Sequence, residues 1–456
     1  MGRFRKGLAS SVVALELLLW LPRISAAAPG DVDPGFGIDG RADVATPVDT
    51  FWPRDVDVAT DGSITIVGDF GDPATSDRWP ALVRLTPDGS LDTSFGQDGV
   101  WIGSRSGSAP RAAIRGDGSA IVASRTRVEL PGGARPAIRV FALDPTGALD
   151  VSFSRDGVAT ISVPREEPGC LGNVGDIAIV ADGRIVVPVG GCGNFSPVAR
   201  FGGMIRLLPD GTRDRSFGGD GAVFFRMAIA KECCYITAIQ ALTDEDGSLS
   251  WVGMAQHARD GYESWQQIAT IVRVDGRGRL VAGYGVGGVA RLTGWDVAGE
   301  PAGASLLDSG AIVLAGRGGP GWDQYYGHRM VMKMGADGRP ARAFSDDGVW
   351  TGATLASYGE IPIGTWVDGS GRITSAWTTS DFPSADGGYR LCRLLTVGRL
   401  DRTYASNGCR RGSVPMTVLR LGIEPSPGRR LVLAGYAGGQ PYEPPTAIVA
   451  MRFLTR

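Results

Sequence analysis

The chain has 456 residues, a formal net charge of −2 and a hydrophobic content of 43%. This near-neutral charge, without any basic block, argues against a nucleic-acid-binding protein, which needs a concentrated positive surface. The apolar content argues against a disordered chain, even though glycine (69 residues) and proline (28 residues) are abundant.

The N-terminal residues have the order of a secretory signal peptide. A basic start (residues 3–6) is followed by an apolar run (8–21) and by the small residues "SAAAPG" (25–30). This order predicts a signal peptide over residues 1–28, cleaved near Ala27 or Ala28. An uncleaved membrane anchor is the alternative, but the apolar run is shorter than the roughly 20 residues of a spanning helix. We therefore expect a secreted, periplasmic or cell-surface protein.

One nine-residue motif recurs about every 60 residues through the rest of the chain. Aligned on the aromatic residue, the seven copies are "VDPGFGIDG" (Phe36), "LDTSFGQDG" (Phe95), "LDVSFSRDG" (Phe153), "RDRSFGGDG" (Phe217), "LVAGYGVGG" (Tyr284), "PARAFSDDG" (Phe344) and "LDRTYASNG" (Tyr404). These copies tile residues 29–456 and leave no linker between them. A fixed period predicts one repeat domain rather than several ordinary domains.

Each repeat carries the pattern of four short strands. One strand follows the motif, as in "GVWIG" (99–103), and a second strand leads to a turn that contains Asp-Gly. The dipeptides are Asp61-Gly62, Asp117-Gly118, Asp182-Gly183, Asp246-Gly247 and Asp368-Gly369. A third, apolar strand follows at once, as in "ITIVG" (64–68), and a fourth, such as "ALVRL" (81–85), ends the unit. Asp-Gly between apolar runs indicates a hairpin, because glycine adopts positive φ without strain.

Seven units of four strands predict an all-β fold, a seven-bladed β-propeller with four-stranded blades. Stacking the sheets around an axis buries both faces of each sheet and leaves only short edges. We expect "VDPGFGIDG" (32–40) and "AIVAMRFLTR" (447–456) to lie side by side and close the ring. A pair of β-sandwiches is the alternative, but it does not explain one register repeated along the whole chain.

The unit resembles the delta-60 repeat, a family of tandem β repeats in secreted and surface proteins of bacteria. The pattern "PDG.LD.SFG..DG" is present as "PDGSLDTSFGQDG" (87–99) and "PDGTRDRSFGGDG" (209–221). The resemblance extends over essentially all of residues 29–456 and implies a β-propeller. It implies no known activity and offers no catalytic or ligand-binding residues. The copy around Tyr284 departs most from the pattern.

Charged residues recur at fixed positions in the units. The fourth strands share a basic residue, and only Ala142 breaks the set. The basic residues are Arg84, Arg206, Arg273, Lys333, Arg393 and Arg452. Carboxylates such as Asp92, Asp150 and Asp214 recur in the motif. We interpret the two sets as structural pairs, with a ring of arginines for an anion as the alternative. The Leu and Phe of the motif are expected to fill the seams between blades.

The six cysteines of an exported chain predict disulfides. We expect the pairs Cys170–Cys192, Cys233–Cys234 and Cys392–Cys409, in that order of preference. An adjacent pair of cysteines also resembles one in quinone-cofactor propeller dehydrogenases, but the Trp-containing docking repeats of that family are absent. The chain has no C-x-x-C and only two histidines, so we predict no metal site and no cofactor.

Catalytic motifs are equally scarce. "GYGVGG" (283–288) matches G-x-G-x-x-G, but it lies in a repeat motif with no helix after it, which argues against dinucleotide binding. The aspartate-rich turns lack the closely spaced oxygen ligands of a calcium loop. His257 and His328 are expected in variable loops as solvated residues. No catalytic residue is predicted, although a pair of carboxylates is not excluded.

The loops form two classes, at opposite ends of the expected blades. The turns after the second and fourth strands repeat their sequence, whereas the loops after the first and third strands vary and are rich in aromatic residues. The densest loop is "GWDQYYGH" (321–328). Because repeat proteins place variable insertions on one binding face, we expect Trp322, Tyr325 and Tyr326 to contact a partner, with Trp79 and Trp265 on the same face. The alternative is that these rings only cap the blades.

Two functions remain open from the sequence. The first is a secreted, monomeric binding or scaffold module that presents the variable loops to a protein or glycan. The second is an exported propeller enzyme, a lyase or hydrolase that acts on carbohydrate. The fold decides neither. An enzyme predicts carboxylates clustered at the centre, and a binding module predicts an aromatic surface without such a cluster.

Overall fold

The computed structural model describes most of the chain between residues 28 and 455. The described ranges are 28–45, 51–71, 77–104, 107–131, 133–162, 171–191, 201–226, 236–259, 264–292, 296–298, 303–319, 328–354, 360–380, 387–405, 407–413, 417–423, 430–437 and 446–455. All regular secondary structure in these ranges is β-strand, as the sequence predicts. Within this part of the chain, no helix has the length and hydrophobicity needed to cross a membrane. The predicted signal peptide lies outside it, apart from Ala28.

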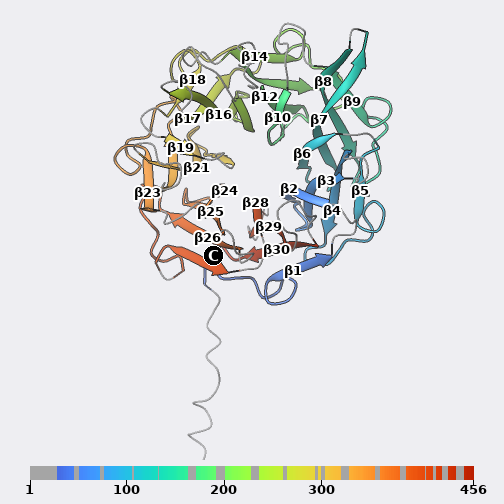
Figure 1. Ribbon diagram of the computed structural model, residues 1–456. Helices are drawn as coiled ribbons and strands as arrows, with labels where there is room; N and C mark the ends of the chain where they lie inside the picture. The colour runs from blue at the N-terminus through green and yellow to red at the C-terminus, as the bar shows by residue number, and fades with distance from the viewer. Residues whose placement is uncertain are drawn as a thin grey trace, which may run out of the picture.

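The strands form seven antiparallel sheets, which follow one another as blades around a ring (Figure 1). Blade I consists of β2 (Phe51–Val58), β3 (Ile64–Gly71), β4 (Arg78–Leu85) and β5 (Val100–Ile102). Blade II consists of β6 (Ser108–Ile114), β7 (Ala120–Leu130), β8 (Gly133–Leu143) and β9 (Val158–Ser162). Blade III consists of β10 (Leu171–Val174) and β11 (Ala178–Ile179), then β12 (Ile185–Gly191), β13 (Phe201–Leu207) and β14 (Ala222–Arg226).

The remaining blades repeat this order. Blade IV consists of β15 (Ile236–Thr243), β16 (Leu249–Arg259), β17 (Ser264–Val274) and β18 (Val289–Arg291). Blade V consists of β19 (Asp296–Ala298) and β20 (Ala304–Leu306), then β21 (Ile312–Gly319), β22 (His328–Met334) and β23 (Val349–Thr354). Blade VI consists of β24 (Pro362–Val367), β25 (Ile373–Ser380), β26 (Gly387–Leu394) and β27 (Cys409–Ser413). Blade VII consists of β28 (Thr417–Ile423), β29 (Leu431–Ala437), β30 (Ala447–Phe453) and β1 (Arg41–Ala45).

The sequence repeat and the blade are offset by one strand, which corrects the assignment of each unit to one sheet. The strand after a motif pairs with the strand before that motif, as β5 pairs with β4 around Phe95. The motif is therefore a turn inside a blade, and the short link after β5 leads to the next blade. The sequence period cannot reveal this offset, because the length of the period is the same whichever strand is taken as the start of the unit.

The offset explains how the ring closes. The first strand of the chain, β1, pairs antiparallel with the last strand, β30, from Arg41–Met451 to Ala45–Ala447. Blade VII thus combines the two ends of the described chain, as the ring closure predicted from the sequence requires. The ladder is reinforced by the backbone bridge between Val32 and Phe453.

In blades I to VI, the hairpin before the second long strand turns on a glycine with positive φ. Gly62, Gly118, Gly183 and Gly247 have φ between 79° and 86°. In blade VI the predicted turn at Asp368-Gly369 is wrong by two residues. There Gly371 has φ 74°, and its N–H donates to the carbonyl of Asp368 at 2.8 Å. Ser370-Gly371 thus takes the structural place of Asp-Gly, because only the left-handed position demands glycine.

The core lies in the seams between blades, and the motif aromatic fills them as expected. Phe95 is fully buried and packs with Val67 and Leu82 of blade I and with Val122 and Phe141 of blade II. The next blade comes so close that a side chain at Gly147 would lie 2.8 Å from the amide nitrogen of Gly96. The motif is repeated because each seam between blades needs the same buried aromatic residue.

Antiparallel pairing gives the ring two different faces. The glycine turns and the motif turns lie at one end of every blade, which we call the motif face. The connections β3–β4 and β5–β6, with their equivalents, lie at the other end, which we call the variable face. This is the division that the loop classes of the sequence predict.

Candidate functional site

The recurring basic residue packs on the aromatic residue of the motif. Its cationic group lies over the ring in six seams. The distances to the ring centroid are 4.0 Å for Arg84–Phe95, 4.5 Å for Arg206–Phe217, 5.6 Å for Arg273–Tyr284, 5.9 Å for Lys333–Phe344, 4.6 Å for Arg393–Tyr404 and 4.7 Å for Arg452–Phe36. A cation over an aromatic face is stabilised by the ring quadrupole, most strongly when it is removed from water.

Several of these arginines also pair with the motif carboxylate, as predicted. Arg206 Nε lies 2.7 Å from Asp214 Oδ2, and Arg393 Nε lies 2.8 Å from Asp401 Oδ2. Burial raises the pKa of Asp214, but the hydrogen bonds from Ser216 and the charge of Arg206 outweigh it and hold that pKa below its usual value. We call the recurring basic residue, stacked on the motif aromatic residue and paired in several seams with the motif aspartate, the clamp. Because the clamp engages these arginines in packing, they do not form a free ring for an anion.

The same clamp ties one blade to the next. Arg84 donates to the carbonyl of Pro145 at 2.7 Å and to that of Gly118 at 2.6 Å, and both carbonyls belong to blade II. Arg393 of blade VI donates to the carbonyl of Thr455, beyond β30 of blade VII, at 3.2 Å. The repeated residues are therefore occupied by packing, and a function has to be sought where the repeats differ.

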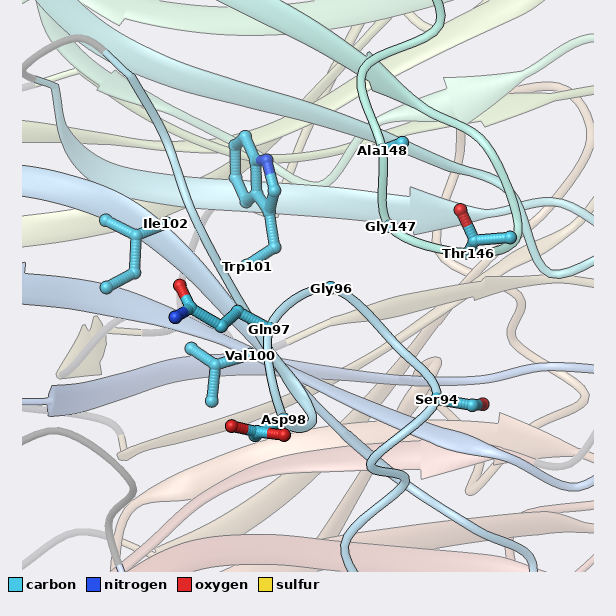
Figure 2. Close-up of a pocket in the computed structure, with 10 residues that line it drawn as sticks. All are labelled: Ser94, Gly96, Gln97, Asp98, Val100, Trp101, Ile102, Thr146, Gly147 and Ala148. Carbon is cyan, nitrogen blue, oxygen red and sulfur yellow. The ribbon is translucent and has the colours of Figure 1, made fainter.

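A groove of about 790 Å³ opens between blades I and II on the motif face (Figure 2). It lies between the turn around Gly96 and the turn around Thr146, with Trp101 at one side. The hydroxyl of Thr146 already donates to Asp144 at 2.6 Å, and that of Ser94 to Asp92 at 2.5 Å. These two hydroxyls serve the turns of the repeat, and the lining otherwise offers the exposed side chains of Gln97 and Asp98.

A second pocket, of about 500 Å³, lies between blades IV and V at the most divergent motif copy. Val281 stands where five of the other copies have the motif aspartate, and Arg273 pairs instead with Asp244 of the β15–β16 turn. Burial raises the pKa of Tyr284, whose hydroxyl has no hydrogen-bond partner among the described residues. The pocket thus lies where the usual pair of the recurring arginine and the motif aspartate is replaced.

The innermost strands carry a cluster of ionisable groups. Asp57 of β2 accepts the N–H of Ile114 of β6 at 2.8 Å, and Arg111 of β6 lies 2.8 Å from Asp176, between β10 and β11. Burial raises the pKa of Asp57 to about 6, with a smaller contribution from the charge of Asp176, while the N–H donors act in the opposite direction. A carboxyl that titrates near neutral pH is suited to proton transfer.

At the variable end of blade I, a buried carboxylate holds two half-exposed arginines. The side chain of Asp69 in β3 is 0% exposed, whereas those of Arg54 and Arg78 are 43% and 40% exposed. Arg54 Nε lies 2.8 Å from Asp69 Oδ2, and Arg78 Nη1 lies 4.0 Å from the same oxygen. Arg78 also lies over the ring of Trp52, 4.6 Å from its centroid. The other blades lack this arrangement in sequence, because residues such as Arg125 and Arg317 occupy the position of Asp69.

The predicted contact residues can be placed only in part. Trp79 lies in β4 rather than in a loop; it is half-buried and packs against Phe70 with ring centroids 5.8 Å apart. Trp265 lies in β17, opposite Ala258, because the β16–β17 hairpin extends farther than predicted; its side chain is outside the described part. Trp322, Tyr325 and Tyr326 lie outside the described residues and stay predictions.

The predicted disulfide Cys392–Cys409 is confirmed. It joins the paired strands β26 and β27 of blade VI, at directly opposite positions. The other candidates, Cys170, Cys192, Cys233 and Cys234, lie outside the described residues. The chain pairs Cys392 with Cys409 because the strand after the motif folds back beside the strand before it.

The histidines are not loop residues, contrary to expectation. His257 lies in β16, and His328 is the first residue of β22. The His328 ring nitrogen Nδ1 lies 3.0 Å from the carbonyl of Gly352 in the neighbouring strand. Among the described residues, no group of three or more His, Cys, Asp or Glu side chains is arranged to hold a metal ion.

Comparisons with known proteins agree on the fold. A family model described as "Domain of unknown function (DUF5122) beta-propeller" matches residues 59–95, from the β2–β3 turn to the motif of blade I. No curated protein matches the chain.

Solved structures of similar fold have very different sequences. A protein of unknown function from Dyadobacter fermentans is 13% identical, with 92% of this chain and 100% of that chain covered and a TM-score of 0.42. The β-propeller domain of the Trilobed protease from Pyrococcus furiosus is 9% identical (90% and 97% covered, TM-score 0.42). An α-L-arabinofuranosidase from Fusarium graminearum is 9% identical (90% and 96% covered, TM-score 0.43). The strand pairing makes the chain a seven-bladed β-propeller, and residues 59–95 match a propeller family without an assigned function.

Proposed function

We propose that the protein is an exported binding module and that its variable face is the working surface. One observation carries the proposal: at the variable end of blade I, buried Asp69 holds two half-exposed arginines in place. A buried charge is costly to keep in a fold, and here its partners point at solvent rather than into the core. Such preorganisation is typical of recognition surfaces.

The aromatic residues of the same face support this proposal. Trp79 and Phe70 form a half-buried pair at the end of blade I, and Trp265 lies at the equivalent end of blade IV. Together with Trp322, Tyr325 and Tyr326 of the β21–β22 connection, they would contact a protein or glycan partner of the monomer. Large aromatic residues and arginine are enriched at interfaces, because they supply contact area with little loss of conformational freedom. The proposed location is the cell surface, the periplasm or the medium.

A binding screen tests the proposal. The processed protein would be applied to arrays of glycans and polysaccharides and to surface extracts, beside the variants Trp79→Ala and Arg277→Ala. Arg277 is an exposed arginine of the motif face, so its variant is the matched control. We expect Trp79→Ala to weaken binding by about tenfold or more, as truncation of an aromatic anchor does, and Arg277→Ala to leave it unchanged. Equal effects of the two variants, at unchanged thermal stability, would contradict the proposal.

The second candidate is a carbohydrate-active enzyme, and the inner-strand carboxylates favour it. Asp57, with its raised pKa, and Asp176 would serve as the acid and base near the ring axis. Turnover assays on any polymer that binds would decide between the two functions. If the parent protein releases sugar fragments and Asp57→Asn does not, the protein is an enzyme. If a polymer binds without turnover, the protein is a binding module.

A further inference from the structure

We propose that the chain is processed between Ala27 and Ala28, and that the α-amino group released there pairs with Asp31 to complete the seam between blades VI and VII. The processing site and the role of the new N-terminus go beyond the proposed function. They require export of the protein but no binding partner.

In an ordinary seam, the turn before the motif is one continuous segment. In blade I, the N–H of Thr86 donates to the carbonyl of Ser90 at 2.8 Å, and the N–H of Gly89 donates to that of Thr86 at 2.9 Å. Gly89 has φ 93° and lies against the ring of Phe36, where a Cβ would be 3.0 Å from Cζ. The turn thus also covers the motif aromatic residue of the preceding blade.

In the seam between blades VI and VII, the same turn is built from two segments that are far apart in the chain. The N–H of Leu454 donates to the carbonyl of Asp31 at 2.9 Å, and the N–H of Gly30 donates to that of Leu454 at 2.7 Å. Gly30 has φ 87°, and a Cβ there would lie 2.7 Å from Cζ of Tyr404, the motif aromatic residue of blade VI. Residues 28–31 therefore supply the second half of the turn.

The contacts of Ala28 distinguish between the two cleavage positions that the sequence allows. Its nitrogen donates to Asp31 Oδ2 at 2.6 Å, and its carbonyl accepts the N–H of Asp31 at 2.9 Å. Cleavage after Ala27 keeps both bonds, whereas cleavage after Ala28 removes them and leaves Pro29 first. The small residues Ser25 and Ala27 meet the A-x-A-like pattern for the first of these positions.

Cleavage after Ala27 changes the donor to Asp31 from a neutral N–H to an ammonium group. The hydrogen bond then becomes charge-assisted, which makes it roughly twice as strong as a neutral one. The other oxygen of Asp31, Oδ1, accepts a hydrogen bond from Nη1 of Arg410 in β27 at 2.5 Å. One carboxylate thus joins the released N-terminus to blade VI, with a separate oxygen for each cation.

The other ionisable groups of this seam have their own partners or carry no charge. Burial raises the pKa of Tyr404, so its hydroxyl is neutral at physiological pH. Arg393, whose guanidinium lies over the Tyr404 ring, pairs with Asp401 at 2.8 Å. The side chain of Tyr389 hydrogen-bonds to Arg410. These contacts leave Oδ2 of Asp31 to the N-terminus.

The test begins with protein that a bacterial host exports under the chain's own N-terminal segment. Mass spectrometry of the first peptide should identify Ala28 as the N-terminal residue. The rate at which acetic anhydride acetylates its α-amino group is then measured from about pH 6 to 9.5, which gives the pKa of that group. Because Asp31 favours the charged form, this pKa should lie above the usual value of about 8.

Two variants should shift this pKa in opposite directions. Asp31→Asn removes the partner, so the pKa should fall by about half a unit or more and acetylation at pH 7 should become about threefold faster. Arg410→Ala removes the competing cation, so acetylation should become slower than in the parent protein. Asp43→Asn is the matched control, because this carboxylate of β1 pairs with Arg41 at 2.5 Å, and it should react like the parent. Thermal unfolding checks that each variant is folded.

The outcomes separate this inference from the proposed function. If the exported protein begins at another residue or keeps residues 1–27, the processing site is wrong, while a binding module remains possible to test by its own screen. If the protein begins at Ala28 but neither Asp31→Asn nor Arg410→Ala changes the acetylation rate, the pairing with Asp31 is wrong.

Discussion

Arg452, in the last strand of the chain, lies over the ring of Phe36 near its beginning, with 4.7 Å between its guanidinium carbon and the ring centroid. Its Nε donates to Asp33 at 2.9 Å, and its Nη1 donates to the carbonyl of Pro87 in blade I. The clamp that ties each blade to the next thus also closes the ring, between residues at the two ends of the described chain.

Breaking this closure should destabilise the whole protein. Arg452→Ala removes the bonds to Asp33 and to Pro87 and leaves Asp33 with Arg430, whose Nε lies 3.0 Å from Oδ2, as its remaining ion-pair partner among the described residues. It should lower the free energy of unfolding by about 2 kcal/mol. Urea unfolding would measure the loss, and the double variant with Asp33→Asn should be less destabilised than the sum of the two single variants. Additive effects would show that the two residues are not coupled.

The disulfide of blade VI should stabilise the fold. Cys392 and Cys409 are separated by 17 positions, and closing a loop of this length contributes about 3 kcal/mol through the unfolded state, on a chain-entropy account. We expect the double variant Cys392→Ser/Cys409→Ser to unfold at lower urea concentration than the parent protein. Peptide mapping without reduction should recover the two cysteines in one linked peptide. Recovery of both as free thiols from exported protein would contradict the assignment.

Asp57 should make stability depend on pH in a distinct direction. Its pKa is about 6 in the folded protein and close to 4 in an unfolded chain, so the folded state favours the protonated carboxyl. The resulting stabilisation is complete below about pH 4 and is lost as the pH rises through 6. Since Asp57→Asn cannot ionise, its free energy of unfolding relative to the parent protein should rise by on the order of 2 kcal/mol between pH 4 and 7.5.

Urea unfolding at four pH values across this range would measure the difference. The exposed carboxylate Asp98 offers a matched control, because Asp98→Asn removes the same charge from the surface of a turn. Parallel pH profiles for Asp57→Asn and the parent protein would rule out the raised pKa.

The divergent clamp of blade V should be repairable. Lys333 stands in place of arginine, Ala341 stands in place of the motif aspartate, and burial lowers the pKa of Lys333. Ala341→Asp should supply the missing carboxylate and stabilise the protein by about 1 kcal/mol, as a partly buried, hydrogen-bonded pair does. Thermal unfolding measures the gain, with Ala341→Asn as the uncharged control. A destabilised Ala341→Asp variant would show that this seam has no room for the pair.

The sequence predicted the fold because its signals are local and repeated. Every seam has the same packing requirements. They are met by Phe95 and its counterparts, by the glycines with positive φ and by the recurring basic residues. Even the proximity of the chain ends follows, because the first and last units of a predicted propeller are neighbours in the ring. Cys392–Cys409 could be proposed from position, because the two cysteines flank one motif.

Only the tertiary structure decided how the units divide into blades, since strand pairing across the motif is independent of where a repeat is taken to begin. It also decided the site on blade I. Trp52, Arg54, Asp69 and Arg78 lie on three strands, and no spacing in the sequence distinguishes them from other charged and aromatic residues. Their grouping depends on strand register, on a neighbouring blade that supplies the N–H of Ala109, and on a glycine that lets an indole ring approach. Such contacts join residues far apart in the chain, so they exist only once the ring is assembled.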